Sequence, residues 1–521
     1  MDTKKRNGII AAGHPITAEA GKIILEAGGN AYDAVAGAFF AACLAEPSLA
    51  SLGGGGYLMA HTKDNDNLLY DFFVQTPGQK KDQAERDFYP VEVDFGGAVQ
   101  VFHIGMASSA VPGGAKGIFQ IQSELGKMPI EKVIEPAVKF AREGVKINQF
   151  ASFLFKILDG IYKSQSETLK LFESHQEKGE LLKKGEILKN KELANVLEFL
   201  AKNGVEEFYR GEIGRRLVKD MQEKGGLIDI DDMKNYQVKK RKPLAIKYRE
   251  ADFITNPPPS AGGILIAFAL KLLEKIDLRK ITYGSAEHLM ALIVAMEKTG
   301  IARKEKLNEN IEKEGLVEEM LSREYLEKFT KDIEERVNKW GSTTQISIID
   351  KDGNIASMTV TNGEGSGYLI PETGSVLNNM LGEEDLNPKG FFEWTPNRRI
   401  SSMMAPSVVI KDNLKIALGS AGSNRLRSAI LQTMINVLDF GKNMDDAVNG
   451  PRLHFENGKL DIEPGFGKET AQKIKKEFPQ ANIWKENNLF FGGANCVMVE
   501  DENKFSGAGD IRREGVCLKV K

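Results

Sequence analysis

The chain has 521 residues, of which 41% are apolar and 27% charged, an ordinary composition for a globular protein with a sizeable core. The 70 Lys and Arg residues nearly balance the 73 Asp and Glu residues, which gives a net charge of −3 and a pI of about 6.2. Because nucleic-acid binding needs a basic surface, nucleic acid is not an expected partner.

A membrane span and a signal peptide are also not expected. The longest apolar run, Ala34–Ala45, is shorter than the roughly 18 residues that cross a bilayer. After its basic start, the N-terminus has only Ile9–Ala12 as an apolar stretch, whereas a signal peptide needs about 7–15 residues. We therefore expect a cytoplasmic protein.

Cysteine and histidine spacing gives no sign of a metal site. The three cysteines have no CxxC neighbour, and the six histidines show no HxxxH spacing. The sequence calls for neither a metal nor an organic cofactor.

The first predicted elements are two helices and a glycine-rich connection. Thr17 can cap a helix that runs to about Ala27, and Ala31–Ala45 is apolar nearly all round, which predicts a buried helix. Gly53–Gly56 then precedes a predicted strand at Tyr57–His61. Four glycines could hold an anion on their N–H groups, but no Lys-Ser/Thr follows as in a P-loop, so we favour a tight passage between elements.

Further amphipathic patterns predict helices over the middle of the chain, and a Pro-rich connection, Asn256–Gly263, leads into the last of them. From Ile301 to Trp340, 20 of 40 residues are charged, which predicts solvated surface helices and the clearest internal boundary. The four predicted helices are Glu131–Glu143, Asn190–Asn203, Ile213–Lys224 and Ile264–Leu273.

After that boundary the pattern becomes that of β-structure. Apolar alternation predicts two hairpins and a strand near the C-terminus, with one apolar helix among them. Strand pairs mixed with apolar helices favour a sandwich with helices on its outer faces. The predicted elements are Thr344–Asp350 with Ile355–Thr361, Ser407–Ile410 with Leu414–Leu418, the helix Asn424–Asp439, and Ala494–Val499.

Seven short motifs are spread over nearly the whole chain. Four lie in the first half: AGGNAYDA (Ala27–Ala34), SLGGGGY (Ser51–Tyr57), AVPGG (Ala110–Gly114) and PPPSAGG (Pro257–Gly263). Three follow: TTQISIIDKDGN (Thr343–Asn354), RRISSMMAP (Arg398–Pro406) and GSAGSNR (Gly419–Arg425). In this order they resemble the gamma-glutamyltranspeptidase family, and the last three resemble its small subunit, which would start at Thr343.

The resemblance implies an N-terminal nucleophile hydrolase of the α+β class, with a four-layer αββα sandwich formed by both halves of a precursor. Such a precursor cuts its own backbone before a threonine, here at the Ser342–Thr343 bond. Residues 1–342 would be the large-subunit portion and 343–521 the small-subunit portion of one intertwined domain. The partners implied are the two fragments, as a heterodimer, and a small-molecule substrate; further homo-oligomerisation stays open.

Cleavage would turn Thr343 into a nucleophile with its own base. A free α-amine has a reference pKa of about 7.7–8.0, which leaves a useful neutral fraction for taking the hydroxyl proton without any histidine. By resemblance, Thr361 would orient that hydroxyl, the N–H groups of Gly422 and Ser423 would form the oxyanion hole, and Ser401 and Ser402 would hold a substrate carboxylate.

The positions at which family members bind the glutamate of the substrate differ in this sequence. Phe73 stands where glutamate-binding members have an arginine, and an aromatic ring cannot replace a bidentate arginine–carboxylate contact. Gly363 stands where an asparagine is expected, with Asn362 beside it. The acidic residue that meets the substrate amine would be Glu383 or Glu384.

The leading hypothesis is a self-cleaving amidase that acts on gamma-glutamyl amides such as glutathione, by hydrolysis or by transfer to an amine. One alternative, favoured by Phe73, is an acylase of the same fold with a non-glutamyl pocket, of the cephalosporin-acylase-like kind. Another is an uncleaved, non-enzymatic protein that binds an anion. We further hypothesise that the C-terminal end of the charged segment leaves the site after cleavage.

Overall fold

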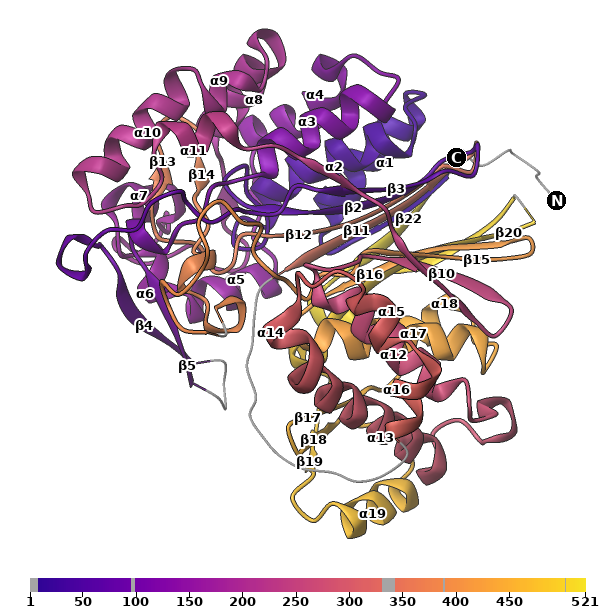
Figure 1. Cartoon of the computed structure of the whole chain (residues 1–521). Coiled ribbons are helices and arrows are strands. Elements are labelled where there is room, and N and C mark those ends of the chain that lie inside the picture. The colour runs from indigo at the N-terminus through magenta and orange to yellow at the C-terminus, as the bar shows by residue number, and fades with distance from the viewer. Residues whose placement is uncertain (1–7, 95–98, 330–342, 388, 502) are drawn as a thin grey trace.

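The computed structural model describes residues 8–94, 99–329, 343–387, 389–501 and 503–521, and two antiparallel sheets lie face to face at its centre (Figure 1). The first sheet has seven strands, and the second has six. In spatial order the first contains β22 (Val516–Val520), β1 (Gly8–Ala12), β11 (Thr344–Asp350), β12 (Ile355–Thr361), β2 (Gly55–His61), β3 (Asn67–Asp71) and β8 (Lys239–Arg241). The second contains β21 (Lys504–Ala508), β20 (Gly493–Glu500), β16 (Leu414–Ala421), β15 (Ser407–Lys411), β10 (Ala251–Thr255) and β9 (Leu244–Tyr248).

Helices cover the outer face of each sheet, which makes four αββα layers (Figure 1). On the first sheet pack α1 (Pro15–Glu26), α2 (Ala31–Ala45) and α3 (Gly114–Leu125), with α4 (Ile130–Glu143) packed on α2 and α8 (Lys191–Asn203) on α4. On the second pack α12 (Ala261–Leu273), α17 (Arg425–Leu438) and α18 (Met444–Asn449), with α13 (Ala286–Ala302) packed on α12. The predicted α+β sandwich is therefore confirmed.

The alternation in β11 and β12 decides which layer each side chain meets. Ile346, Ile348 and Met358 point to the helices of the first layer, where they join a large apolar cluster. The intervening side chains point to the second sheet: Ser347 Oγ donates to the carbonyl of Asn495 at 2.8 Å. A strand between two layers needs both of its faces buried, and every residue of both strands is buried.

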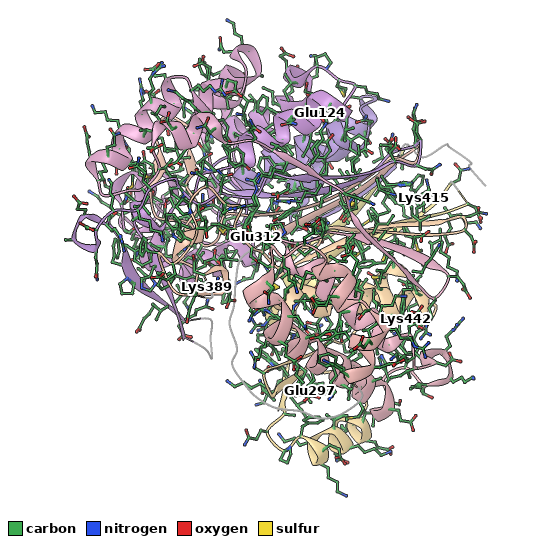
Figure 2. The ribbon with its side chains drawn as sticks, viewed as in Figure 1. Glu124, Glu297, Glu312, Lys389, Lys415 and Lys442 are labelled. Carbon is green, nitrogen blue, oxygen red and sulfur yellow. The ribbon has the colours of Figure 1, made fainter. Side chains whose placement is uncertain are left out.

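The remaining α-helices and strands mostly surround this sandwich. They are α5 (Gln149–Ile157), α6 (Asp159–Tyr162), α7 (Ser166–Phe172), α9 (Glu206–Tyr209), α10 (Glu212–Glu223), α11 (Ile230–Asn235), α14 (Asn308–Asn310), α15 (Leu316–Met320), α16 (Arg323–Lys328), α19 (Lys468–Glu477), β4 (Tyr89–Asp94), β5 (Val99–Ile104), β6 (Val145–Lys146), β7 (Ile187–Leu188), β13 (Leu369–Ile370), β14 (Ser375–Val376), β17 (Leu453–Glu456), β18 (Lys459–Ile462) and β19 (Asn482–Ile483). Exposed charged side chains such as Glu124 and Lys389 lie at the surface (Figure 2). None of the described helices has the length and apolar character that a membrane span requires.

Two details of the first half differ from the predictions. His14, not Thr17, caps α1, because Thr17 is buried and its hydroxyl donates to Glu46 at 2.7 Å. Gly55 and Gly56 belong to strand β2 and not to a loop. A Cβ at Gly56 would lie 2.4 Å from the carbonyl oxygen of Thr359, so glycine is needed there for close approach to the paired strand.

The charged segment is less solvated than its composition predicts. Leu307, Leu316 and Met320 are at most 2% exposed and pack in the apolar cluster of the second layer. An amphipathic segment with many charges can therefore still bury one face. Residues 330–340, on which the hypothesis about the segment's movement depends, lie outside the described residues.

Candidate active site

Pairing of β11 with β12 brings the two predicted catalytic threonines together. Thr344 pairs with Val360, so the next position along the antiparallel ladder sets Thr343 opposite Thr361. By the alternation of the strands, both threonines lie on the face that meets the second sheet. They are 6% and 7% exposed, so each is nearly enclosed while still reaching the pocket.

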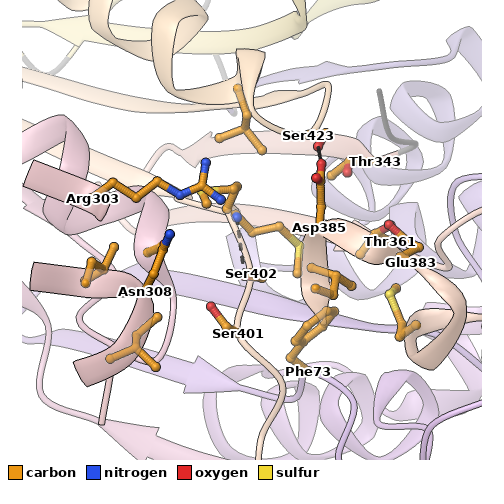
Figure 3. Close-up of a pocket in the computed structure, with 18 residues that line it drawn as sticks. Phe73, Arg303, Asn308, Thr343, Thr361, Glu383, Asp385, Ser401, Ser402 and Ser423 are labelled. Atoms are coloured by element: carbon orange, nitrogen blue, oxygen red, sulfur yellow. Dashed lines mark hydrogen bonds between the residues drawn. The ribbon is translucent and has the colours of Figure 1, made fainter. Parts of the chain in front are cut away.

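A pocket lies beside these threonines (Figure 3). It includes most of the residues that the sequence predicts for the site, although they come from distant parts of the chain. The lining residues are Phe73, Ala261, Arg303, Leu307, Asn308, Ile311, Thr343, Thr361, Met380, Glu383, Asp385, Leu386, Ser401, Ser402, Met403, Met404, Ser423 and Leu426.

A buried carboxylate fixes the residue next to Thr343. The hydroxyls of Thr344 and Thr17 each donate to Glu46 at 2.7 Å, one to each carboxylate oxygen. Burial raises the pKa of Glu46, and these two hydrogen bonds offset part of the rise. These hydrogen bonds therefore link the start of β11 to the end of α2, and they fix the backbone next to Thr343.

The turn between β16 and α17 has a strained backbone. Gly422 has φ of 113° and Ser423 a φ of 46°, both in the left-handed region that side chains other than glycine rarely adopt. A Cβ at Gly422 would lie 2.9 Å from Cα of Gly492. Ser423 lines the pocket, and its hydroxyl donates to Asp385 at 3.2 Å, which holds the turn in place. Gly422 is not among the lining residues.

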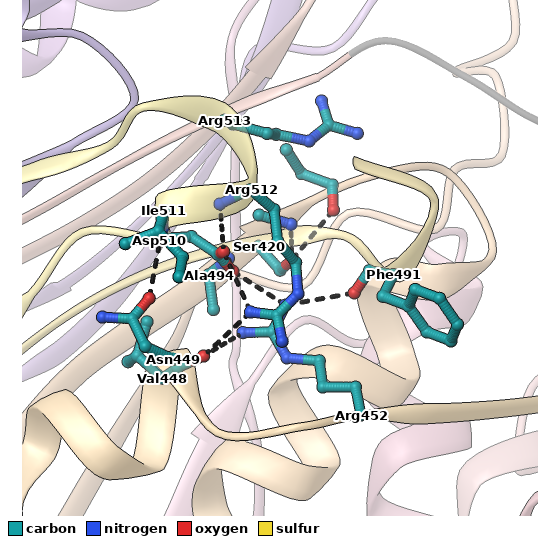
Figure 4. Close-up of polar contacts among 12 residues, drawn as sticks. Ser420, Val448, Asn449, Arg452, Phe491, Ala494, Asp510, Ile511, Arg512 and Arg513 are labelled. Carbon is teal, nitrogen blue, oxygen red and sulfur yellow. Dashed lines mark hydrogen bonds and ion pairs between the residues drawn. The ribbon is translucent and has the colours of Figure 1, made fainter. Parts of the chain in front are cut away.

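A buried ionic network lies at the start of β20, beside the end of β16 that leads into this turn (Figure 4). Asp510 pairs with Arg452 at 2.7 Å and with Arg512 at 3.1 Å, and it accepts from the N–H of Ala494 at 2.8 Å. Burial alone would raise the pKa of Asp510, but the two arginines hold it below its ordinary value. The network joins β20 to the C-terminal region close to the turn at Gly422.

The serine pair lies at the N-terminal end of α12. The backbone N–H of Ala261 donates to the carbonyl of Ser402 at 2.7 Å, and both Ser401 and Ser402 line the pocket. This helix begins three residues earlier than predicted, with two glycines in its first turn. A Cβ at Gly262 would lie 2.0 Å from the carbonyl oxygen of Met403, so glycine is needed for the helix to approach the serine segment.

Of the two candidate acidic residues, Glu383 lines the pocket, whereas Glu384 is exposed and is not among the lining residues. Glu383 Oε1 is buried and has no hydrogen-bond partner among the described residues. Burial raises the pKa of Glu383 well above its ordinary value, and the nearby carboxylates Glu364 and Asp385 raise it further. A cationic group of a ligand would relieve this situation.

Phe73 fills the position at which the family's arginine is expected. Its side chain is fully buried and packs on Tyr57, with ring centroids 5.8 Å apart. Arg399 holds the backbone of this segment: it pairs with the buried Asp71 at 3.0 Å and donates to the carbonyl of Phe73. Since Arg399 is not among the lining residues, it does not supply a cation to the pocket.

Sequence reasoning missed two charged lining residues, Arg303 and Asp385. Arg303 begins a π-helical turn, Arg303–Leu307, that extends α13. The sequence offers a signal for it, because Leu307 and Ile311 follow Arg303 at four-residue steps, the spacing of one helix face. Both apolar residues also line the pocket. Asp385 lies in the acidic stretch that supplied Glu383. Ser342, the other side of the predicted cleavage, lies outside the described residues.

The αββα layering places this chain in the class of N-terminal nucleophile hydrolases and transferases. The chain belongs to the gamma-glutamyltranspeptidase family, whose model matches residues 17–520. It is 29% identical over 547 residues to the glutathione hydrolase proenzyme of Escherichia coli (strain K12), covering 98% of this chain and 91% of that one. It is 28% identical over 537 residues to the acylase ACY 1 proenzyme of Pseudomonas sp. (strain V22), covering 98% and 93%.

Solved structures agree with the fold. The cephalosporin acylase from Bacillus halodurans superposes with a TM-score of 0.85 at 23% identity, covering 99% of this chain and 96% of that one. The gamma-glutamyltranspeptidase of Helicobacter pylori superposes with a TM-score of 0.54 at 26% identity, covering 63% and 91%. The likeness to the acylase structure shows the fold alone.

Proposed function

We propose that the protein is a self-cleaving amidase in which Thr343, released as an N-terminus, forms an acyl-enzyme that is then resolved by water or an amine. The observation that carries this proposal is the meeting of Thr343 and Thr361 across the β11–β12 ladder at a pocket that also contains Ser401, Ser402 and Ser423. The names of relatives that include the word proenzyme support the cleavage.

In this mechanism the α-amine of Thr343 takes the proton of its own hydroxyl, whose oxygen then attacks the amide carbonyl of the substrate. The C–N bond of the tetrahedral intermediate breaks as the ammonium returns the proton to the leaving amine, which leaves an ester on Thr343 Oγ; water or an acceptor amine then displaces that oxygen in the same way. Thr361 orients the nucleophile, consistent with its place opposite Thr343. The N–H groups of Gly422 and Ser423 stabilise the tetrahedral oxyanion, in a turn that is already held by Asp385 and so needs little reorganisation.

The acyl group would be bound by the serine pair on one side and by a carboxylate on the other. Ser401 and Ser402 offer hydroxyl donors at the start of α12, and Glu383 offers a buried acceptor for a substrate amine. Together they fit an amino-acid-like acyl group, and glutathione and other gamma-glutamyl amides are the first candidates.

A second candidate is an acylase with a non-glutamyl acyl group. The specific observation in its favour is Phe73, which is fully buried and packs on Tyr57 at the position where a glutamate-binding arginine is expected. The 28% identity to the Pseudomonas acylase over 98% of the chain gives this candidate the same support as the hydrolase.

Denaturing electrophoresis tests the self-cleavage. Scaled by length from 57.5 kDa, processing at Ser342–Thr343 gives bands of roughly 38 and 20 kDa, and the smaller band begins Thr-Thr-Gln-Ile. A Thr343→Ala variant stays whole, because alanine cannot attack the preceding carbonyl. An uncut wild-type chain with no amidase activity would refute the proposal and would favour the anion-binding alternative.

A further inference from the structure

Arg303 is the one cationic side chain among the described residues that line the pocket. Its side chain is 19% exposed, so it is largely covered but not fully enclosed. It comes from the end of α13, on the helical side of the pocket (Figure 3). Thr361 and Glu383 lie across the pocket from it (Figure 3).

The contacts of Arg303 hold its guanidinium at the pocket without neutralising it completely. Its Nη1 lies 3.3 Å from Asn424 Oδ1 and 3.3 Å from Glu456 Oε1. The same oxygen of Glu456 accepts from Arg427 at 2.9 Å, so one carboxylate serves two arginines. Unlike Arg303, Arg427 is not among the lining residues.

The pocket is therefore polarised. Glu383 stands on the side of the nucleophile, and Arg303 stands opposite. Asp385, the other acidic lining residue, accepts a hydrogen bond from the Ser423 hydroxyl, and the apolar Phe73, Met403 and Met404 also line the pocket. A carboxylate that enters an enclosed pocket loses hydration and needs a cationic partner, which serine hydroxyls alone do not supply. The planar guanidinium of arginine suits a carboxylate through paired N–H donors.

We propose that Arg303 binds a carboxylate of the substrate's acyl group, in the role that Phe73 cannot perform. The preferred substrates are then amides whose acyl chain ends in a carboxylate, and an amine beside that carboxylate would be bound by Glu383. This inference rests on the proposed acyl transfer to Thr343 and specifies its substrate class.

Three anilides derived from one acyl skeleton, by removing its amine or its carboxylate, test the inference, because their leaving group is uncharged. The γ-glutamyl anilide carries a carboxylate and an amine, the glutaryl anilide only the carboxylate, and the 4-aminobutyryl anilide only the amine. We expect Arg303→Met to lower kcat/KM about 30-fold or more for the first two, the effect of losing a charged hydrogen bond, and to leave the third unchanged within about twofold. Arg303→Lys should retain part of the activity on both carboxylate substrates.

Arg427→Met is the matched control, since it removes a cation from the same Glu456 without touching the pocket lining. If both variants lower activity on all three anilides alike, Arg303 supports structure only and the inference is wrong. An Arg303→Met enzyme that still prefers the carboxylate substrates would also overturn it.

A binding measurement separates this inference from the catalytic proposal. Calorimetry with the free acids glutarate and 4-aminobutyrate requires no turnover and can use whichever form, cut or uncut, the purified protein adopts. We expect Arg303→Met to weaken glutarate binding at least about 10-fold and to leave 4-aminobutyrate binding unchanged. If Arg303→Met binds glutarate as tightly as the wild type, the role of Arg303 is refuted, even when the enzyme is active. If the variant loses glutarate affinity but the wild-type protein shows no amidase activity, the role of Arg303 stands and the catalytic proposal is wrong.

Discussion

At the scale of single residues, Glu383 gives the site a dependence on pH. Its pKa is raised by burial and by two neighbouring carboxylates, so the folded protein keeps this side chain protonated at a pH where an unfolded glutamate, with a pKa of about 4.3, is ionised. As the pH rises between these two pKa values, the unfolded state gains stability relative to the folded state. The contribution of Glu383 to the stability of the folded protein is thus fully present below the pKa of the unfolded state, and it is lost as the pH rises through the raised pKa of the folded state.

Glu383→Gln removes this cost because glutamine cannot ionise. In a Thr343→Ala background, which keeps a single chain, we expect the Tm of the Gln variant to rise relative to its parent as the pH increases from 5 to 8. The exposed Glu384→Gln is the control and should show no such trend. A Tm difference that stays constant with pH would contradict the raised pKa.

Glu46 makes a second residue-scale prediction. Replacing it with alanine leaves the buried hydroxyls of Thr17 and Thr344 without their acceptor, which should cost about 1–3 kcal/mol of stability and slow self-cleavage. Because Glu46→Gln keeps a carbonyl acceptor, this variant should retain most of the stability and most of the rate of self-cleavage. Chemical denaturation of uncut variants and a time course of fragment formation would measure these effects; equal losses in the two variants would mean that the charge, not the hydrogen bonding, matters.

At the scale of elements, the close approach of α12 to the serine segment should tolerate no added methyl group. A Cβ at Gly262 would lie 2.0 Å from the carbonyl oxygen of Met403, so Gly262→Ala must displace Ser401 and Ser402 or the helix itself. We expect it to cost about 1–3 kcal/mol and to raise KM.

Gly300→Ala in α13 is the control for this substitution, because no atom lies within 4 Å of the added Cβ. It should stabilise the protein by about 0.5–1 kcal/mol, as alanine does in a helix interior, with KM unchanged. If Gly262→Ala changed neither stability nor KM, the contact between α12 and the segment of Ser401 and Ser402 would be looser than its hydrogen bonds indicate.

The same elements show what the sequence could predict. The β11–β12 hairpin and helix α2 follow from local patterns, namely alternation over seven residues and an apolar run without a polar face. Strand β1 could not be predicted from a local pattern, because its five residues are all buried and do not alternate. The strands with which it pairs lie more than 300 residues away in the sequence. Most predicted site residues line one pocket, but the charge composition around Arg303 predicts a solvated surface. Its partner Glu456 and the pocket are brought to it only in the folded chain.

At the scale of the whole molecule, the strands of the two predicted fragments interleave. In the first sheet β1 lies between β22 and β11, and β12 pairs with β2. Strands from the portion 1–342 therefore pair with strands from the portion 343–521. In the second sheet β10 pairs with β15 across the same division. Neither portion has a complete sheet of its own, which supports the proposal of one intertwined domain.

Cleavage should therefore leave the two fragments together. We expect the processed protein to elute from a sizing column as one species containing both bands, and to separate only in denaturant, because dissociation would expose the edges of several buried strands. Residues 1–342 and 343–521 expressed separately should each be insoluble or unfolded, since each lacks the strands that pair with its own. Separation of the fragments in native buffer, with both remaining folded, would show that each portion is a domain by itself.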